Sequence, residues 1–287
     1  MSDGRLTGHQ GRAASKPAPA PGSTPGPTLV VVSHYNSWPP DQLVALLDQM
    51  ATVPAGAPFE VCVVVNQANP SPLTLPERHG GVRVLRRENT GYNVGAWEHG
   101  RRESPGHDCY LFLQEECRIV RAGWLRAFRR LAMRPEVGLV GESLHWGGLS
   151  WRRVARQYRG SGFWGAAEGE TVSVVDGVLG GLRRLGVPAG STGAHLQTLA
   201  LCARAEVLDA IGGLPTGNSY GEATIAEIAL SKKVEALGLK VREIGPGSFR
   251  YVLHPQWRRR QGVARWVARA AARRVPVRVT EWLKALR

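Results

Sequence analysis

The chain has 287 residues, 43% of them hydrophobic, and a formal net charge of +14 at pH 7. This length and apolar content suffice for one large domain or two small ones with a substantial core. No apolar run approaches the roughly 18–20 residues of a membrane-spanning helix, and the N-terminal residues lack the apolar core of a signal peptide. The composition therefore argues against membrane-spanning and secreted proteins and predicts a cytoplasmic one.

The positive charge is concentrated at the C-terminal end of the chain. Residues 250–287 hold eleven Lys or Arg residues and one acidic residue, so most of the excess charge lies there. The cysteines are scattered through apolar contexts and form no CxxC pair, which predicts buried, reduced thiols rather than disulfides or a metal cluster. These cysteines are Cys62, Cys109, Cys117 and Cys202.

Three segments follow one another along the chain. Residues 1–27 are rich in Pro, Gly and Ala and cannot bury enough apolar surface to fold, so we expect them to be disordered. Residues 28–255 carry the patterns of a folded domain, and residues 256–287 form the basic tail.

Short apolar runs alternate with helical patterns between residues 28 and 245. Strands are predicted at residues 28–36, 59–68, 81–89, 109–119, 137–143 and 239–245. Helices are predicted at residues 39–50, 90–100, 121–135 and 226–238. Strands that alternate with helices and are apolar throughout form a parallel sheet covered on both faces, so we expect an α/β domain.

Polar residues end four of these strands, at the edge where the ligand site of an open α/β sheet lies. The apolar run of residues 110–113 stops abruptly at Gln114, Glu115 and Glu116, which favours a site over an exposed turn. The other polar strand ends are His34, Tyr35, Asn36, Asn66, Glu88 and Asn89. We expect all of these side chains around one crevice, although asparagines are equally typical of turns that follow strands.

Six stretches carry a family resemblance. VVVSHYN (30–36), VCVVVNQA (61–68) and RRENTGYNVGAWEHG (86–100) are followed by LFLQEECRI (111–119), EVLDAIGGL (206–214) and AEIALSKKVEALG (226–238). In this order and spacing they resemble the motifs of glycosyltransferase family 2 from residue 28 to residue 254, and GAHLQTLALCARAEVL (193–208) is similar to rhamnosyltransferase-like members. The resemblance implies the GT-A fold, a Rossmann-like, mixed and mostly parallel sheet flanked by helices in a single domain.

The resemblance also implies a nucleotide-sugar donor, bound by the strand ends and by the turn after residue 88. The donor-binding residues that it implies are His34, Tyr35, Asn36, Asn66, Asn89, Gly91, Asn93, Gln114 and Glu115. Two of them depart from the family, because Asn66 stands for an Asp and Gln114 for the first acid of the DXD motif. Glu116 keeps the second acid, and with His254 it is implied to bind a divalent cation, Mg²⁺ or Mn²⁺, on the diphosphate.

The catalytic expectation rests on the same resemblance. Glu227 falls at the place of the general base that deprotonates the acceptor hydroxyl, and Glu222 is a nearby alternative. The family implies inversion at the anomeric carbon and a glycan or lipid-linked acceptor, in polysaccharide or glycolipid assembly. A surface helix position near Lys232 and Lys233 is the simpler interpretation of Glu227.

Tryptophans are frequent in the less regular segment 146–191. We expect them either to stack on the sugar rings of the acceptor or to pack as a lid; they are Trp146, Trp151 and Trp164. A non-catalytic relative that binds nucleotide sugars or carbohydrates is the alternative function, which the amide at Gln114 and Ala226 before Glu227 favour.

The basic tail has the pattern of an amphipathic helix. Trp266 and Val267 share one helical face, and Arg265, Arg269 and Arg273 share another. This pattern is typical of helices that bind an anionic membrane surface, which would place the protein on the inner face of a membrane. Packing of the tail on the domain is the alternative, and nucleic acid is the least favoured partner because the tail matches no nucleic-acid-binding module.

Overall fold

The computed structural model describes residues 26–163, 172–245 and 247–255. The predictions for the N-terminal segment before residue 26, for Trp164 and for the basic tail lie outside these residues. In the described part of the chain, no helix has both the length and the apolar content needed to cross a membrane.

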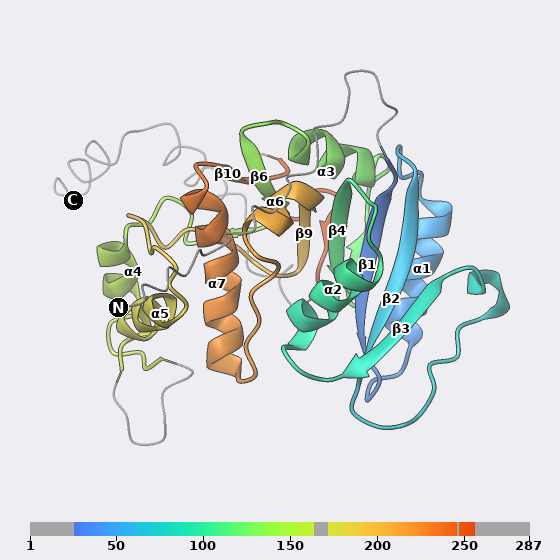
Figure 1. Cartoon of the computed structure of the whole chain (residues 1–287), viewed down its shortest axis with the longest axis horizontal. Helices are drawn as coiled ribbons and strands as arrows, with labels where there is room; N and C mark the ends of the chain where they lie inside the picture. The colour runs from blue at the N-terminus through green and yellow to red at the C-terminus, as the bar shows by residue number, and fades with distance from the viewer. Residues whose placement is uncertain (1–25, 164–171, 246, 256–287) are drawn as a thin grey trace, which may run out of the picture.

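A seven-stranded sheet forms the centre of the molecule, with the strand order β10-β6-β9-β4-β1-β2-β3 (Figure 1). Its strands are β1 Thr28–Tyr35, β2 Phe59–Gln67, β3 Arg83–Glu88, β4 Cys109–Gln114, β6 Val137–Gly141, β9 Ala200–Arg204 and β10 Lys240–Glu243. All neighbouring strands pair in parallel except β9, which runs antiparallel to both β4 and β6. The expected α/β fold with a mixed, mostly parallel sheet flanked by helices is confirmed.

Helices cover both faces of this sheet, because alternate residues of each strand point to opposite sides. Val30 and Val32 of β1 pack in one core with residues of two helices, α1 Asp41–Thr52 and α3 Trp124–Ala132. Leu29 and Val31 pack in a second core on the other face. The helices of that face are α2 Tyr92–Glu103, α6 Ala205–Ala210 and α7 Tyr220–Ala236.

A third apolar cluster lies beside the sheet. It joins α7 to the helices α4 Trp151–Gln157 and α5 Val174–Arg184, which form the left-hand end of the molecule in Figure 1. Its buried members include Trp146, Val154 and Ile225.

Short pairings bring distant segments to the end of β4. The strand β11 Val252–Leu253 pairs with β5 Arg118–Ile119, which follows the turn after β4. The strand β8 His195–Leu196 pairs with β7 Leu144–His145. One short 3₁₀ helix, Glu77–His79, lies in the connection between β2 and β3.

Two further expectations have a clear outcome. The four cysteines are buried and free, as predicted. The last predicted helix begins earlier than residue 226, because Ser219 and Glu222 form a capping box that starts α7 at Tyr220.

Candidate functional site

The end of β4 connects to two segments that are far away in the sequence. The Gln114 side-chain Nε2 donates to the carbonyl of Thr198 at 2.6 Å, and its Oε1 lies 3.0 Å from Nε2 of His254. Because the Gln114 amide nitrogen is already donating to a carbonyl, its oxygen is the atom that faces His254. His254 therefore carries its ring proton on Nε2 and donates it to Gln114.

His254 is a buried, neutral imidazole. Its side chain is 1% exposed, and its Nδ1 has no hydrogen-bond partner among the described residues. Burial, with a smaller contribution from the nearby Arg118 guanidinium, lowers the pKa of His254 to about 4. In this arrangement Nε2 donates to Gln114, so Nδ1, which has no partner among the described residues, is the ring nitrogen with a lone pair free for a cation. The role of His254 as a metal ligand stays a prediction.

The two acids after Gln114 have different surroundings. Glu115 joins the ends of β1 and β4, because one of its oxygens accepts from the Tyr35 backbone N–H at 3.0 Å and the other lies 2.6 Å from Nδ1 of His34. Glu116 lies 3.9 Å from His254 Nε2, and burial raises the pKa of its carboxyl. Glu115 is thus committed to holding two strands together, and Glu116 remains available for a ligand.

The donor set for a divalent cation at this place is small. No group of three or more His, Cys, Asp and Glu side chains in the described ranges is arranged to hold a metal. Mg²⁺ and Mn²⁺ in nucleotide sites use one or two carboxylates and take other ligands from phosphates and water. Glu116 fits such a shared site as its protein carboxylate.

Glu227 is held by His195 and Thr198, for which the sequence had predicted no role. One carboxylate oxygen accepts from the Thr198 backbone N–H at 2.7 Å and from its hydroxyl at 2.6 Å, and the other lies 3.4 Å from Nε2 of His195. Burial alone would raise the pKa of Glu227, but the contacts with His195 and Thr198 outweigh it and hold the pKa below its usual range. The carboxylate is therefore ionised at neutral pH, and 21% of the side chain is exposed.

Thr198 links the two halves of the site. Its carbonyl accepts from Gln114, and its N–H and hydroxyl donate to Glu227. Polar contacts therefore run from Glu116 through His254, Gln114 and Thr198 to Glu227. The structure brings the end of β4 and α7 together through Thr198, which lies in the run 193–208 that the family resemblance had marked.

Glu142 is a further residue for which the sequence had predicted no role. It follows β6 and is 1% exposed, and its carboxylate accepts from the backbone N–H groups of Arg250, Tyr251 and Val252. Burial raises the pKa of Glu142 to about 7. This carboxylate fastens the segment that ends at His254, and its position after a buried strand is the same signal that had marked Gln114.

The predicted asparagines shape loops at the same edge. The Asn36 amide donates to the carbonyl of Asn69 at 2.8 Å, and its oxygen accepts from the Ala68 N–H. Asn66 donates to the carbonyl of Tyr92 and accepts from Arg87. Both side-chain amides bond to protein groups. Asn36 and Asn66 would therefore help to bind a nucleotide by holding the loops in place, and not by direct contact.

The turn after β3 has the conformation that its glycine predicts. Gly91 has a φ of 69° and caps α2, and Asn93 accepts from the Ser33 hydroxyl at 2.9 Å. Asn89 is exposed in the same turn. Thr216 packs against Gly91, where an added Cβ would come within 3.0 Å of it. The turn thus lies next to the loop that leads into α7.

The expectations for three other residues need correction or stay open. Trp146 is 3% exposed, enclosed by His145, Trp151, Tyr158 and His195, so the prediction that it offers a face to a sugar is wrong. Trp151 is partly buried, and its Nε1 donates to the carbonyls of Ala189 and Gly190. Glu222 accepts from the backbone N–H groups of Asn218 and Ser219, which assigns it to capping α7.

The sequence matches no protein-family model and no curated protein. Among solved structures, the chain is similar to the mannosyltransferase PcManGT from Pyrobaculum calidifontis in complex with GDP-Man and Mn²⁺, with 16% identity and a TM-score of 0.46. The match covers 77% of this chain and 55% of that one, so the chain spans about half the length of this relative.

Two other solved structures show a comparable likeness. Glucosyl-3-phosphoglycerate synthase from Mycobacterium tuberculosis, in complex with Mn²⁺, UDP and glucosyl-3-phosphoglycerate, has 15% identity and a TM-score of 0.43, over 86% of this chain and 76% of that one. GalNAc-T7 with UDP, GalNAc and Mn²⁺ has 10% identity and a TM-score of 0.46, over 76% and 42%.

Proposed function

We propose that this protein is an inverting glycosyltransferase that moves a sugar from a nucleotide-sugar donor to an acceptor hydroxyl. The observation that carries the proposal is the run of polar contacts from Glu116 through His254, Gln114 and Thr198 to Glu227. It joins a buried carboxylate suited to a diphosphate with its cation to an ionised carboxylate suited to accept a proton.

Glu227 has the protonation state that a general base needs. Because His195 and Thr198 hold its pKa below the usual range, it is unprotonated when the acceptor arrives. The acceptor O–H bond breaks and its proton passes to Glu227, while the oxygen forms a bond to the anomeric carbon. The bond from that carbon to the diphosphate breaks with its electrons on the leaving oxygen. Attack on the face opposite the leaving group inverts the anomeric carbon.

The donor would lie along the carboxyl edge of β1, β2 and β4. The loops organised by Asn36 and Asn66 and the turn at Gly91 border the expected nucleotide position. A divalent cation bound by Glu116 would neutralise charge on the leaving diphosphate. His34 and Glu115 keep the ends of β1 and β4 in register beside it.

The acceptor would enter from the start of α7. A cavity of about 200 Å³ lies there, and its lining includes Arg184, Thr216, Asn218, Glu222 and Ile225. Thr216, in the lining of this cavity, packs against Gly91 of the turn after β3. Polar and apolar groups together suit a glycan or lipid-linked acceptor, in the polysaccharide or glycolipid assembly that the family resemblance implies.

A non-catalytic nucleotide-sugar-binding protein is the second candidate. The observation that favours it is that both oxygens of Glu227 are already engaged, one by Thr198 and the other by His195. Gln114, at the position of the first acid of the DXD motif, likewise uses both atoms of its amide group in hydrogen bonds with Thr198 and His254.

A ligand screen followed by a transfer assay tests both candidates. UDP-, GDP- and dTDP-sugars are added with and without Mn²⁺, and a donor that binds the folded state raises the melting temperature. We expect one donor to do so and to support transfer, and Glu227→Gln to bind it normally without transfer. Binding with no transfer by either protein supports the second candidate, and no shift with any donor contradicts both.

A further inference from the structure

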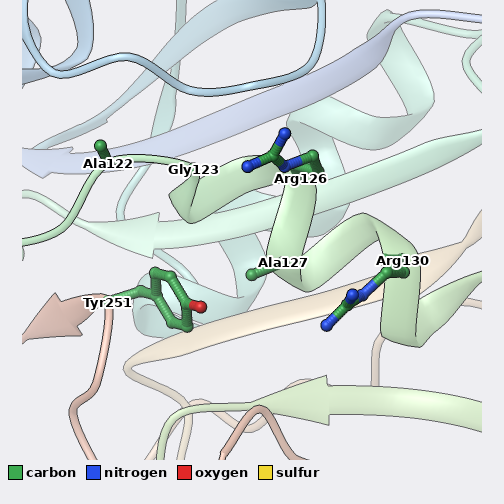
Figure 2. Close-up of a pocket in the computed structure, with 6 residues that line it drawn as sticks. All are labelled: Ala122, Gly123, Arg126, Ala127, Arg130 and Tyr251. Carbon is green, nitrogen blue, oxygen red and sulfur yellow. The ribbon is translucent and has the colours of Figure 1, made fainter.

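Two arginines of α3 line a cavity with Tyr251, and two further arginines lie near the Tyr251 ring. Arg126 and Arg130 line a cavity of about 400 Å³ together with Tyr251, over a floor of small residues that includes Ala127 (Figure 2). The guanidinium carbons of Arg121 and Arg250 lie 5.5 and 6.0 Å from the centre of the same ring. We call this group of residues the arginine pocket.

The arginine pocket has an unbalanced positive charge. Within the part of the chain that the structure describes, none of its four guanidinium groups forms an ion pair or a hydrogen bond, and no acidic side chain lines the cavity. All four arginines are exposed. Some arginines elsewhere do have acidic partners: Arg78 binds Asp48, and Arg101 binds Glu98. Repulsion between the unpaired cations is relieved when an anion enters.

The walls of the arginine pocket are fixed by backbone contacts. The Tyr251 N–H donates to Glu142 at 2.9 Å, and its carbonyl accepts from the Val120 N–H at 2.9 Å. On the other side, the Gly123 N–H donates to the carbonyl of Pro54 at 2.7 Å. A pocket whose walls are held in this way loses little backbone freedom on binding.

We propose that the arginine pocket binds a phosphate group carried on a small organic body. Guanidinium groups bind phosphate through two parallel N–H···O contacts, which favours it over anions without that geometry. The volume of about 400 Å³ exceeds one phosphate and leaves room for a sugar or glycerol beside it, against the Tyr251 ring. The ligand class is therefore a phosphate ester or diphosphate, from a soluble metabolite or a lipid headgroup.

The test compares three double variants of the full chain. Arg126→Ala with Arg130→Ala removes two cations from the pocket. Arg152→Ala with Arg156→Ala removes two exposed cations from α4 and serves as the charge-matched control. Arg126→Lys with Arg130→Lys keeps the charge and loses the planar two-point contact.

Binding is measured with inorganic pyrophosphate by calorimetry and with phosphatidylcholine vesicles, with and without phosphatidic acid, by flotation. We expect the pocket alanine variant to bind about tenfold more weakly than the wild type, the control to match the wild type and the lysine variant to lie between them. This pattern with pyrophosphate assigns a soluble ligand, and the pattern with anionic vesicles alone assigns a lipid headgroup.

Two results would overturn the proposal. Equal losses in the pocket alanine variant and the control would show attraction to general surface charge. Absence of binding by the wild type to both probes would show that the arginine pocket has no phosphate ligand. Circular dichroism of each variant confirms folding. If the alanine variant is unfolded, the lysine variant, which keeps the charge and the long side chains, provides the test instead.

Discussion

The polar groups at the end of β4 are paired with one another, whereas the cations of the arginine pocket are not. At the site, His34 faces Glu115, Gln114 donates to Thr198, and Thr198 donates to Glu227. In the arginine pocket, the four guanidinium groups have no acidic partner among the described residues. A network whose members satisfy one another fixes geometry, whereas unpaired cations favour an external anion. Substitutions should therefore change reaction and stability in the first region, and binding alone in the second.

The two regions meet in one short segment. Tyr251 forms a wall of the arginine pocket, and His254, three residues later, contacts Gln114 in the site. Glu142 holds this segment through three backbone N–H groups. Because the two regions share this segment, substitutions should be placed in one region at a time.

The largest effect is expected for Glu227→Gln. Loss of the general base should reduce transfer about 10²–10⁴-fold, with donor binding unchanged, because the amide cannot take the acceptor proton. Initial rates and donor affinity are measured side by side. Glu136→Gln, an exposed change outside both regions, is the control. Transfer at the wild-type rate by Glu227→Gln would remove Glu227 from the mechanism.

Glu142→Gln should change how stability depends on pH. Burial raises the pKa of Glu142 to about 7 from its ordinary value of 4.5, so the folded state keeps a proton that the unfolded state loses. This group therefore lowers stability as pH rises from about 4.5 to about 7, by on the order of 3 kcal/mol in total. The glutamine variant lacks this decline.

Denaturant unfolding of the wild type and Glu142→Gln at several pH values measures the difference. The free energy of unfolding of the wild type, relative to the variant, should fall between pH 5 and 7 and then level off. A constant difference across this range would contradict the assignment of Glu142 as the titrating group.

Thr198→Val should alter the base without removing it. The change deletes the hydroxyl that donates to Glu227 at 2.6 Å and keeps the backbone donor. The pKa of Glu227 should rise, so the acidic limb of the pH–rate profile moves to higher pH and kcat falls about tenfold at low pH. Thr224→Val, on the same helix as Glu227, is the control. An unchanged acidic limb would show that Thr198 does not tune Glu227.

The positions of the strands and helices could be predicted from the sequence, because they follow from the local spacing of apolar residues. The strands that end near Tyr35, Asn66 and Gln114 lie where the apolar runs placed them. The direction of β9 was not predicted specifically, because a buried run such as Ala200–Arg204 reads the same for parallel and antiparallel pairing.

The contacts of the site could not be predicted in the same way. The interaction between Thr198 and Glu227 spans 29 residues and depends on how β8 and the loop after it pack on α7. The burial of Trp146 depends on the cluster formed with α4 and α5, which no periodicity in its own segment reveals. Glu142 carried a readable signal, a carboxylate directly after a buried strand.

The smallest effect is expected for Glu222→Ala. This change removes the carboxylate that accepts from Asn218 and Ser219, and loss of a helix cap costs about 1 kcal/mol of stability. Ser219→Ala, which removes the other half of the capping box, should cost a similar amount of stability. A folded Glu222→Ala protein that has lost transfer while Glu227→Gln keeps it would exchange the roles of the two glutamates. In that case the general base would lie in the first turn of α7, and Glu227 would belong to the residues that only stabilise the fold.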